Sequence, residues 1–256
     1  MKKTYTAEVT VEEYFLLNNA PIQEAVIDIQ VKLPLEFDIK KLDSLYESFK
    51  DRYPQKKELR RFEGRLEFEK GKQPVTSVSD QPRGYQFISE DTKQIVQLRA
   101  DGFTFSKLKP YIDWPHLRDE AHNLWQFYRG ATTPLITRIA LRYINKINIP
   151  MPIRDFGEFL TAPPIVPESL PQGVSSFLTR VTLYEPLIDA EAIITQALEP
   201  IIKADFASII LDIDVFKNKP DGIEEKNAWE TLEKLRYFKN RIFFKSITKK
   251  LEEMFK

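Results

Sequence analysis

Cysteine is absent from the sequence, and histidine and glycine are scarce. Without cysteine the chain has no disulfide framework, no thiolate nucleophile and no cysteine-ligated zinc or iron–sulfur site. The two histidines, His116 and His122, are too few for a three-histidine metal site. The eight glycines are scattered, and neither glycine-rich motif that binds nucleotide phosphates is present. Any chemistry must therefore rely on Asp, Glu, Arg and Tyr side chains.

Long apolar runs are missing as well. The most apolar stretch near the start, residues 14–17, is four residues long and follows two glutamates. A signal peptide needs about 7–15 apolar residues and a membrane helix about 20. We therefore expect a cytoplasmic protein that does not interact with a membrane.

Charge of neither sign is in excess. The 256 residues include 38 positive and 38 negative side chains, and 42% of the residues are hydrophobic. This composition is typical of a folded protein and gives no general attraction to nucleic acid. The length predicts one large domain or two small ones.

The spacing of apolar residues predicts strands and helices in turn. Clean alternation predicts strands at residues 24–33 and 135–149. Spacing of three to four residues predicts a first helix that Asp38 caps, a second over residues 114–129 that Gly130 ends, and a final helix over residues 223–255. Further strands are expected at residues 59–69, 85–89, 94–107, 174–184, 190–198 and 207–216. A helix is the alternative for residues 190–198. Residues 71–84 are expected to form a mobile loop.

Two segments that lie 116 residues apart share one pattern. Placing Pro34 over Pro150 aligns VIDIQVKLP with RYINKINIP, and an Asp followed by an apolar residue comes next in both. We predict an α+β fold in which two pseudo-duplicated β-α-β-β-β-α halves form one curved antiparallel sheet, with the helices packed on one face. The alternative is a single helix-grip-like domain whose sheet clasps the long C-terminal helix.

The same reasoning predicts the organisation of the chain. Residues 1–18 form an N-terminal arm, 19–149 the first α+β half and 174–256 the second half with the long C-terminal helix. Residues 150–173 form a connector, because six of the seventeen prolines fall between Pro150 and Pro171 and proline interrupts both helices and ladders.

Several strings occur in a familiar order, namely NAPIQEAVIDI, GYQFIS, IVQLRADGFTFSKLKPYIDW, ITRIALRYINKINIP, LDIDVF and LRYFKNRIFFKSIT. Together they resemble a sporadically distributed bacterial family of conserved proteins of unknown function, over residues 19–255. The resemblance implies no catalytic residues. The patchy distribution of that family implies a setting in phage defence or on mobile elements.

Asp212 and Asp214 lie two residues apart in the strand-like string LDIDVF. Carboxylates at i and i+2 of a strand project from one face, as in Mg²⁺-dependent phosphoryl-transfer sites. The alternative is an ion-paired polar face that needs no metal. We expect no resident cofactor unless these two aspartates bind magnesium.

Arg138, Arg142 and Lys146 form a basic row on the polar face of the strand at residues 135–149. Glu24 and Asp28 occupy the polar face of the matching strand. Ion pairing across the sheet is therefore one interpretation of the row. The other is a polar face, joined by Gln97 and Arg99, that binds an anionic or polar ligand.

Basic residues also gather elsewhere. One run comprises Lys56, Lys57, Arg60, Arg61 and Arg65, and the final helix adds Lys234, Arg236, Lys239, Arg241, Lys245, Lys249 and Lys250. Interleaved aromatics are typical of nucleic-acid surfaces, but neighbouring glutamates favour a solvated face. The two histidines point in different directions on a helix, so we expect them to be ordinary surface residues.

The small number of side chains suited to catalysis and the neutral net charge favour a non-enzymatic binding or assembly module. We expect it to bind a protein partner or to self-associate, in a bacterial defence or stress setting. One alternative is a Mg²⁺-dependent enzyme acting on nucleotide or nucleic acid, with Arg138 and Arg142 on the phosphate. A second is a nucleic-acid-binding protein that uses the basic C-terminal helix.

Overall fold

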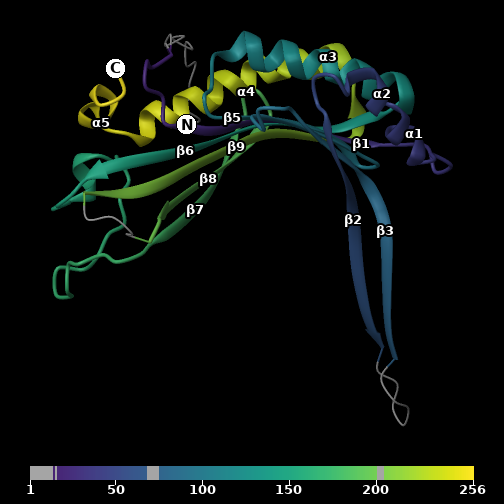
Figure 1. Ribbon diagram of the computed structural model, residues 1–256. Helices are drawn as coiled ribbons and strands as arrows, with labels where there is room; N and C mark the ends of the chain where they lie inside the picture. Colours follow the sequence, from purple (N-terminus) through teal and green to yellow (C-terminus); the bar gives the residue numbers. More distant parts are fainter. Residues whose placement is uncertain (1–13, 15, 68–74, 201–204) are drawn as a thin grey trace, which may run out of the picture.

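Nine antiparallel strands form one open sheet in the computed structural model, which describes residues 14, 16–67, 75–200 and 205–256 (Figure 1). Their order across the sheet is β2-β3-β4-β5-β1-β6-β9-β8-β7. The strands are β1 (Ile22–Lys32), β2 (Gln55–Glu67), β3 (Val75–Ile88), β4 (Gln94–Arg99), β5 (Gly102–Leu108), β6 (Leu135–Pro150), β7 (Leu178–Glu185), β8 (Ala190–Leu198) and β9 (Phe206–Ile223). The predicted α+β class and antiparallel sheet are confirmed.

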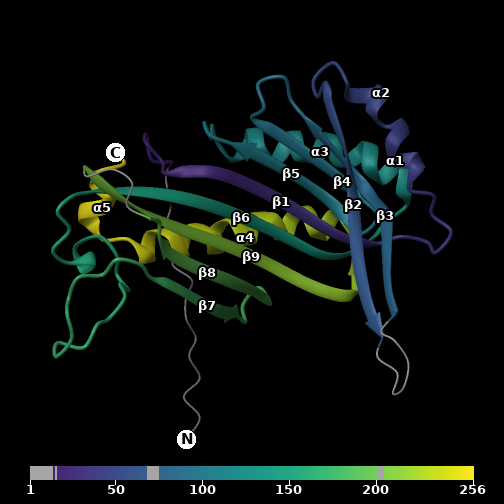
Figure 2. The ribbon, with the colours of Figure 1, turned by 60° about the horizontal axis from the view of Figure 1, so that its bottom comes forward.

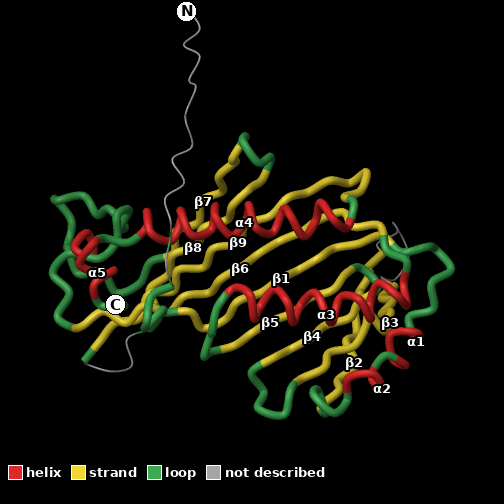
Figure 3. Tube along the Cα trace, turned by 90° about the horizontal axis from the view of Figure 1, so that it is seen from above, coloured by secondary structure: helices red, strands yellow, loops and turns green. Residues whose placement is uncertain are grey.

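Two long helices cover one face of this sheet. The helices are α1 (Lys40–Ser44), α2 (Tyr46–Phe49), α3 (Trp114–Thr132), α4 (Glu225–Ser246) and α5 (Lys249–Glu253), with a 3₁₀ turn at Phe156–Glu158. Viewed from above, α3 and α4 both lie over the strands (Figure 3). With the underside turned forward, the strands stand in front of both helices (Figure 2). Within the described residues, no helix is long and apolar enough to cross a membrane.

The hydrophobic core lies between the sheet and these two helices. Alternate residues of β1, including Ala25, Ile27 and Ile29, are completely buried, as the alternation predicted. The helices contribute Trp125 and Tyr128 from α3 and Leu232 and Leu235 from α4, together with other buried side chains at three-to-four-residue spacing. The sheet therefore has a helical face, which is apolar and covered, and an open face, over which no described helix packs.

The helix α3 begins and ends at different kinds of cap. Asp113 caps its N-terminus, where the Asp113 carboxylate accepts a hydrogen bond from the His116 backbone N–H at 2.9 Å. The predicted end at Gly130 is wrong, because the helix continues to Thr132. Thr133 ends it instead, with a left-handed φ of 47° and a hydrogen bond from its N–H to the Arg129 carbonyl.

Three other predicted elements need correction. Residues 94–107 form two strands, because the chain turns at Ala100 and Asp101; the first half therefore has four strands after α1 and α2 and not three. The final helix stops at Ser246, because Ile247 is extended and bridges to Leu160. Residues 75–84 of the predicted mobile loop belong to β3, and residues 71–74 lie outside the described part of the chain.

Three further segments are the strand at residues 190–198, the proline-rich connector and the N-terminal arm. Residues 190–198 are a strand, β8, and not a helix. The proline-rich connector has no strand or α-helix between Pro150 and Leu178, where every residue is described. Of the predicted N-terminal arm, residues 1–13 and 15 lie outside the described residues. The last residue of the arm contacts the C-terminus, since Asn18 Nδ2 donates to the Lys256 carbonyl at 2.7 Å.

Candidate functional site

The open face of the sheet carries a network of charged side chains centred on Asp28 of β1. One Asp28 oxygen, Oδ1, accepts hydrogen bonds from Arg99 Nη2 at 3.0 Å and from the Thr104 hydroxyl at 2.7 Å. The other, Oδ2, accepts from Arg138 Nη1 at 3.2 Å. Asp28 thus joins β4, β5, β1 and β6, which are successive strands of the sheet.

Arg138 extends this network to β9. Its Nη2 donates to Asp214 Oδ2 at 3.2 Å, and its guanidinium carbon lies 4.4 Å from the centre of the Phe216 ring. Burial raises the pKa of Asp214, while the nearby Arg138 and Arg142 charges oppose the rise. Arg138 is only 16% exposed, so its charge is satisfied by carboxylates within the sheet and is largely withdrawn from solvent.

Arg142 and Asp212 form a second, more exposed pair on the same face. Arg142 Nε and Nη2 contact the two Asp212 oxygens at 2.8 and 2.6 Å, which is a bidentate arrangement. This hydrogen bonding raises the pKa of Arg142, and the charges of Asp214 and Glu24 add to the effect. Glu24 itself makes no ion pair with any described residue. The predicted pairing across the sheet is therefore confirmed for Arg138 and Arg142.

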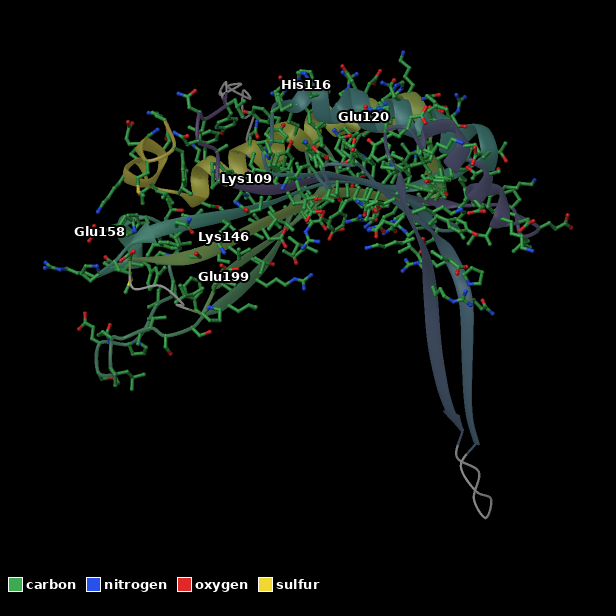
Figure 4. The ribbon with its side chains drawn as sticks, in the orientation of Figure 1. Lys109, His116, Glu120, Lys146, Glu158 and Glu199 are labelled. Atoms are coloured by element: carbon green, nitrogen blue, oxygen red, sulfur yellow. The ribbon has the colours of Figure 1, made fainter. Side chains whose placement is uncertain are left out.

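Lys146 lies apart from the network. Its Nζ is 2.6 Å from Glu199 Oε2, and both residues lie toward the end of the sheet that carries the connector (Figure 4). The structure thus gathers Asp28, Arg99, Arg138 and Asp214, places Arg142 with Asp212 beside them, and leaves Lys146 outside.

This arrangement limits the chemistry of the open face. A cation between Asp212 and Asp214 would have to replace the guanidinium groups that already contact both carboxylates. Within the described residues no group of three or more His, Asp or Glu side chains is placed to hold a metal ion. The magnesium site at Asp212 and Asp214 stays a prediction.

The two histidines are surface residues, as predicted. His116 Nδ1 lies 2.6 Å from Asp113 Oδ1, whereas the His122 ring packs edge-on against Trp229 with ring centres 4.7 Å apart. The predicted solvated face of the final helix is wrong for Lys239, which is 9% exposed. Its neighbours Leu235 and Ile242, four and three residues away, place it on the apolar side of α4, and this spacing was visible in the sequence.

The edge strand β7 is a feature that the sequence interpretation missed. Four of its large apolar side chains are 41–73% exposed, namely Leu178, Val181, Leu183 and Tyr184. Val181 and Leu183 are paired with core-face residues of β8, so they lie on the helical face, and Leu178 and Tyr184 lie on the open face. The mixture of apolar residues at odd and even positions was the available signal, because a half-buried strand alternates.

An apolar groove adjoins this edge on the helical face. A groove of about 340 Å³ lies between α4 and the turn after β7, lined by Leu187, Ile188, Tyr237 and Phe238 among others. Arg241 of α4 contacts the Glu185 carboxylate at the end of β7, which holds the strand beside the helix. The β7 edge and the groove together form an exposed apolar region.

Comparison of the chain with protein-family models and with curated proteins finds no match. The resemblance to a bacterial family therefore stays a prediction, and the function has to be argued from the geometry of the chain.

Proposed function

We propose that the protein is a non-enzymatic assembly module that associates with a second copy of itself through the β7 edge. The observation that carries this proposal is the exposure of four large apolar side chains on a strand at the end of the sheet. In the described structure β7 pairs only with β8, so its outer row of backbone N–H and C=O groups has no strand partner. Such an edge is a template for pairing with another chain.

The opposite edge of the sheet supports this choice by contrast. The first six residues of β2 are QKKELR, and Lys56, Lys57, Glu58 and Arg60 are exposed. Charged residues on an edge strand discourage pairing with other chains. The β7 sequence LTRVTLYE has one basic and one acidic residue, and its glutamate is already bound by Arg241.

The side chains of β7 are complementary to themselves in one register. Two antiparallel copies related by a two-fold axis at Thr182 place Val181 opposite Leu183 of the other copy on the helical face. Arg180 then lies opposite the other copy's Tyr184 on the open face. Apolar and cation–aromatic pairs of this kind stabilise neighbouring strands, and no like charges oppose each other. The two sheets would join into one.

The ion pairs of the open face support a non-enzymatic function over the magnesium-dependent enzyme that acts on nucleotide or nucleic acid. Phosphate groups bind arginines whose charge is available, but Arg138 and Arg142 already contact carboxylates. A magnesium-dependent enzyme or a nucleic-acid site on this face would first have to break these pairs. The polar network therefore acts as internal structure in our proposal.

The strand order supports the predicted internal duplication, which we retain as a proposal. The central strands β1 and β6 pair with each other, and each is flanked by the strand that leads into a long helix, β5 before α3 and β9 before α4. Membership of the bacterial family, a defence or stress setting and a cytoplasmic location stay predictions.

Sedimentation velocity over a concentration series tests the assembly. We expect the wild type to form a dimer and the double variant Val181→Lys, Leu183→Lys to raise the dissociation constant at least about 100-fold, because two lysines in each copy would be buried at the interface. Ile165→Lys is the matched control, since Ile165 is equally apolar and 93% exposed in the connector.

Hydrogen exchange identifies the edge that pairs. The β7 amides should exchange more slowly as the wild-type concentration rises, and the amides of β2 should not change. A wild type that stays monomeric at high concentration would contradict the proposal, as would equal loss of the dimer in the Ile165→Lys control.

A further inference from the structure

A small cavity lies on the helical face, between α4, β6 and the segment before α3. Its volume is about 130 Å³, roughly ten times the ~10–15 Å³ that one water needs. Its polar lining includes Tyr111, Tyr143, Asn145, Arg236 and Lys239. The rest of the wall is largely apolar, with Leu17, Trp114 and Phe243 among its members. The cavity is separate from both the open face and the β7 edge.

Lys239 is the unusual member of this lining. Its side chain is 9% exposed, and its Nζ lies 3.8 Å from the centre of the Tyr143 ring. No carboxylate and no hydrogen-bond acceptor of the described residues contacts Nζ. Burying an ammonium group without an anion is costly, so the cavity favours the neutral amine.

Burial, followed by the nearby Arg236 charge, lowers the pKa of Lys239 to about 7. A large fraction of Lys239 is therefore an uncharged amine at neutral pH, and such an amine is a nucleophile. The other ionisable groups around the cavity do not supply a partner: Asp113 is held by His116, and burial raises the pKa of Tyr111 to about 12. Burial raises the pKa of Tyr143 as well.

Neighbouring groups would position a small ligand. The Tyr143 hydroxyl donates to the Tyr111 hydroxyl at 2.9 Å, so two protonated hydroxyls meet at the cavity wall. Asn145 is fixed by a hydrogen bond from its Nδ2 to the Leu211 carbonyl at 2.9 Å. The Arg236 guanidinium lies over the Trp114 ring at 5.7 Å and is 3.9 Å from Glu233, a long contact that leaves donors for another anion.

We propose that this cavity binds a small 2-oxo acid, which Lys239 captures as a Schiff base while Arg236 receives the carboxylate. The Nζ lone pair attacks the carbonyl carbon and forms a C–N bond. The carbonyl oxygen then leaves as water with both amine protons, and no oxidant or reductant is needed. A tyrosine hydroxyl can donate to the departing oxygen. This reversible capture requires no turnover and does not depend on assembly through β7.

Reductive trapping on the full chain tests the capture. The protein is incubated at neutral pH with pyruvate as the probe and with cyanoborohydride, which reduces the Schiff base and spares the free ketone, and the labelled lysines are identified by peptide mass spectrometry. We expect Lys239 to be labelled at least about tenfold faster than Lys234, an exposed lysine of the same helix. Labelling of Lys239 that is no faster than that of Lys234 would overturn the proposal.

Two variants test whether Lys239 is the lysine that reacts rapidly. Lys239→Met should abolish the fast label and still fold, because it replaces a buried amine by an apolar side chain of similar length. Lys234→Met should retain the fast label. If the fast label persists in Lys239→Met, another lysine is responsible and the proposal is wrong.

The carboxylate preference is tested with hydroxyacetone, a ketone of similar size without a carboxylate. In the wild type we expect pyruvate to label Lys239 about tenfold faster than hydroxyacetone does. In Arg236→Gln this ratio should fall to about one, even if both rates change because the pKa of Lys239 changes. An unchanged ratio in Arg236→Gln would contradict the role of Arg236.

Discussion

The two faces of the sheet are stabilised by different forces, although the same strands supply both. On β6, Leu141 points into the core and is fully buried, whereas the next residue, Arg142, points to the open face and pairs with Asp212. The helical face depends on removing apolar surface from water, which contributes about 25 cal/mol per Å². The open face depends on charges that satisfy one another across strands. The open face is therefore satisfied within the chain, whereas the edge strand β7 leaves large apolar side chains exposed.

The largest effect should come from the helical face. Leu141→Ala removes a fully buried side chain that lies between Ile27 of β1 and Val215 of β9, and we expect it to lower the free energy of unfolding by about 3 kcal/mol. Chemical denaturation measured by circular dichroism checks this value. A loss below about 1 kcal/mol would show that the core collapses around the site and would weaken the contrast between the faces.

The second largest effect on stability should come from a substitution at the centre of the open face. Asp28→Ala removes the acceptor shared by Arg99, Arg138 and Thr104, and leaves two largely buried arginines with fewer partners. We expect the free energy of unfolding to fall by about 2 kcal/mol. Thr104→Val is the control, because it removes the hydroxyl that donates to Asp28 and accepts from Arg99, and keeps both arginine contacts of Asp28. If the two variants cost the same, the ion pairs of Asp28 contribute nothing.

Lys239, a buried basic residue on the helical face, should make the stability of the protein depend on pH. The pKa of Lys239 is about 7 in the folded protein, and that of an ordinary lysine is about 10.4. Between these values the unfolded chain binds a proton that the folded chain lacks, so the stability of the wild type should rise with pH. The contribution of Lys239 is at most about 1.4 kcal/mol per pH unit.

The variant Lys239→Met checks this slope by denaturation between about pH 7 and pH 10. Its slope should be lower than that of the wild type. It should also be the more stable protein at pH 7, because folding of the wild type must there either bury the Lys239 ammonium or release its proton. Arg236, Tyr111, Tyr143 and Asp113 surround the cavity and are unchanged in the comparison. Equal slopes would mean that Lys239 keeps an ordinary pKa in the folded protein.

Local patterns predicted most of the elements. The strands at β1 and β6 and the helix α3 follow from alternation and from three-to-four spacing, because each of them buries one side against the same core. The turn at Ala100 and Asp101 was missed although the sequence marks it. The buried apolar positions change from even numbers, Val96 and Leu98, to odd numbers, Phe103 and Phe105, and Asp101-Gly102 is a typical hairpin dipeptide. The glycine beside this turn, Gly102, has a packing role: a Cβ there would lie 2.5 Å from the Ile29 carbonyl oxygen.

The candidate site was predictable only in part. Alternation placed Asp28, Arg138 and Arg142 on one polar face, and opposite charges on neighbouring strands suggested that they pair. Apolar residues at both odd and even positions of β7 indicated a strand that does not alternate, but its place at the edge was not predictable, because the position of a strand in a sheet depends on contacts between distant segments. The spacing of Leu235, Lys239 and Ile242 showed that Lys239 lies on the apolar side of α4, but its cavity was not predictable, because Tyr143 and Tyr111 reach it from distant parts of the chain.

The smallest effect should come from the rim of the open face. Arg142 is 46% exposed, and its bidentate contact with Asp212 is open to solvent and to salt. Arg142→Ala should therefore lower the free energy of unfolding by about 0.5 kcal/mol at low ionic strength, and by less at about 1 M salt, where exposed charges are screened. Leu141→Ala, one residue away on the other face, should show no such loss of effect with salt. If Arg142→Ala costs as much as Asp28→Ala, the rim pair is as important as the central network, and the gradation from core to rim that distinguishes the two faces does not exist.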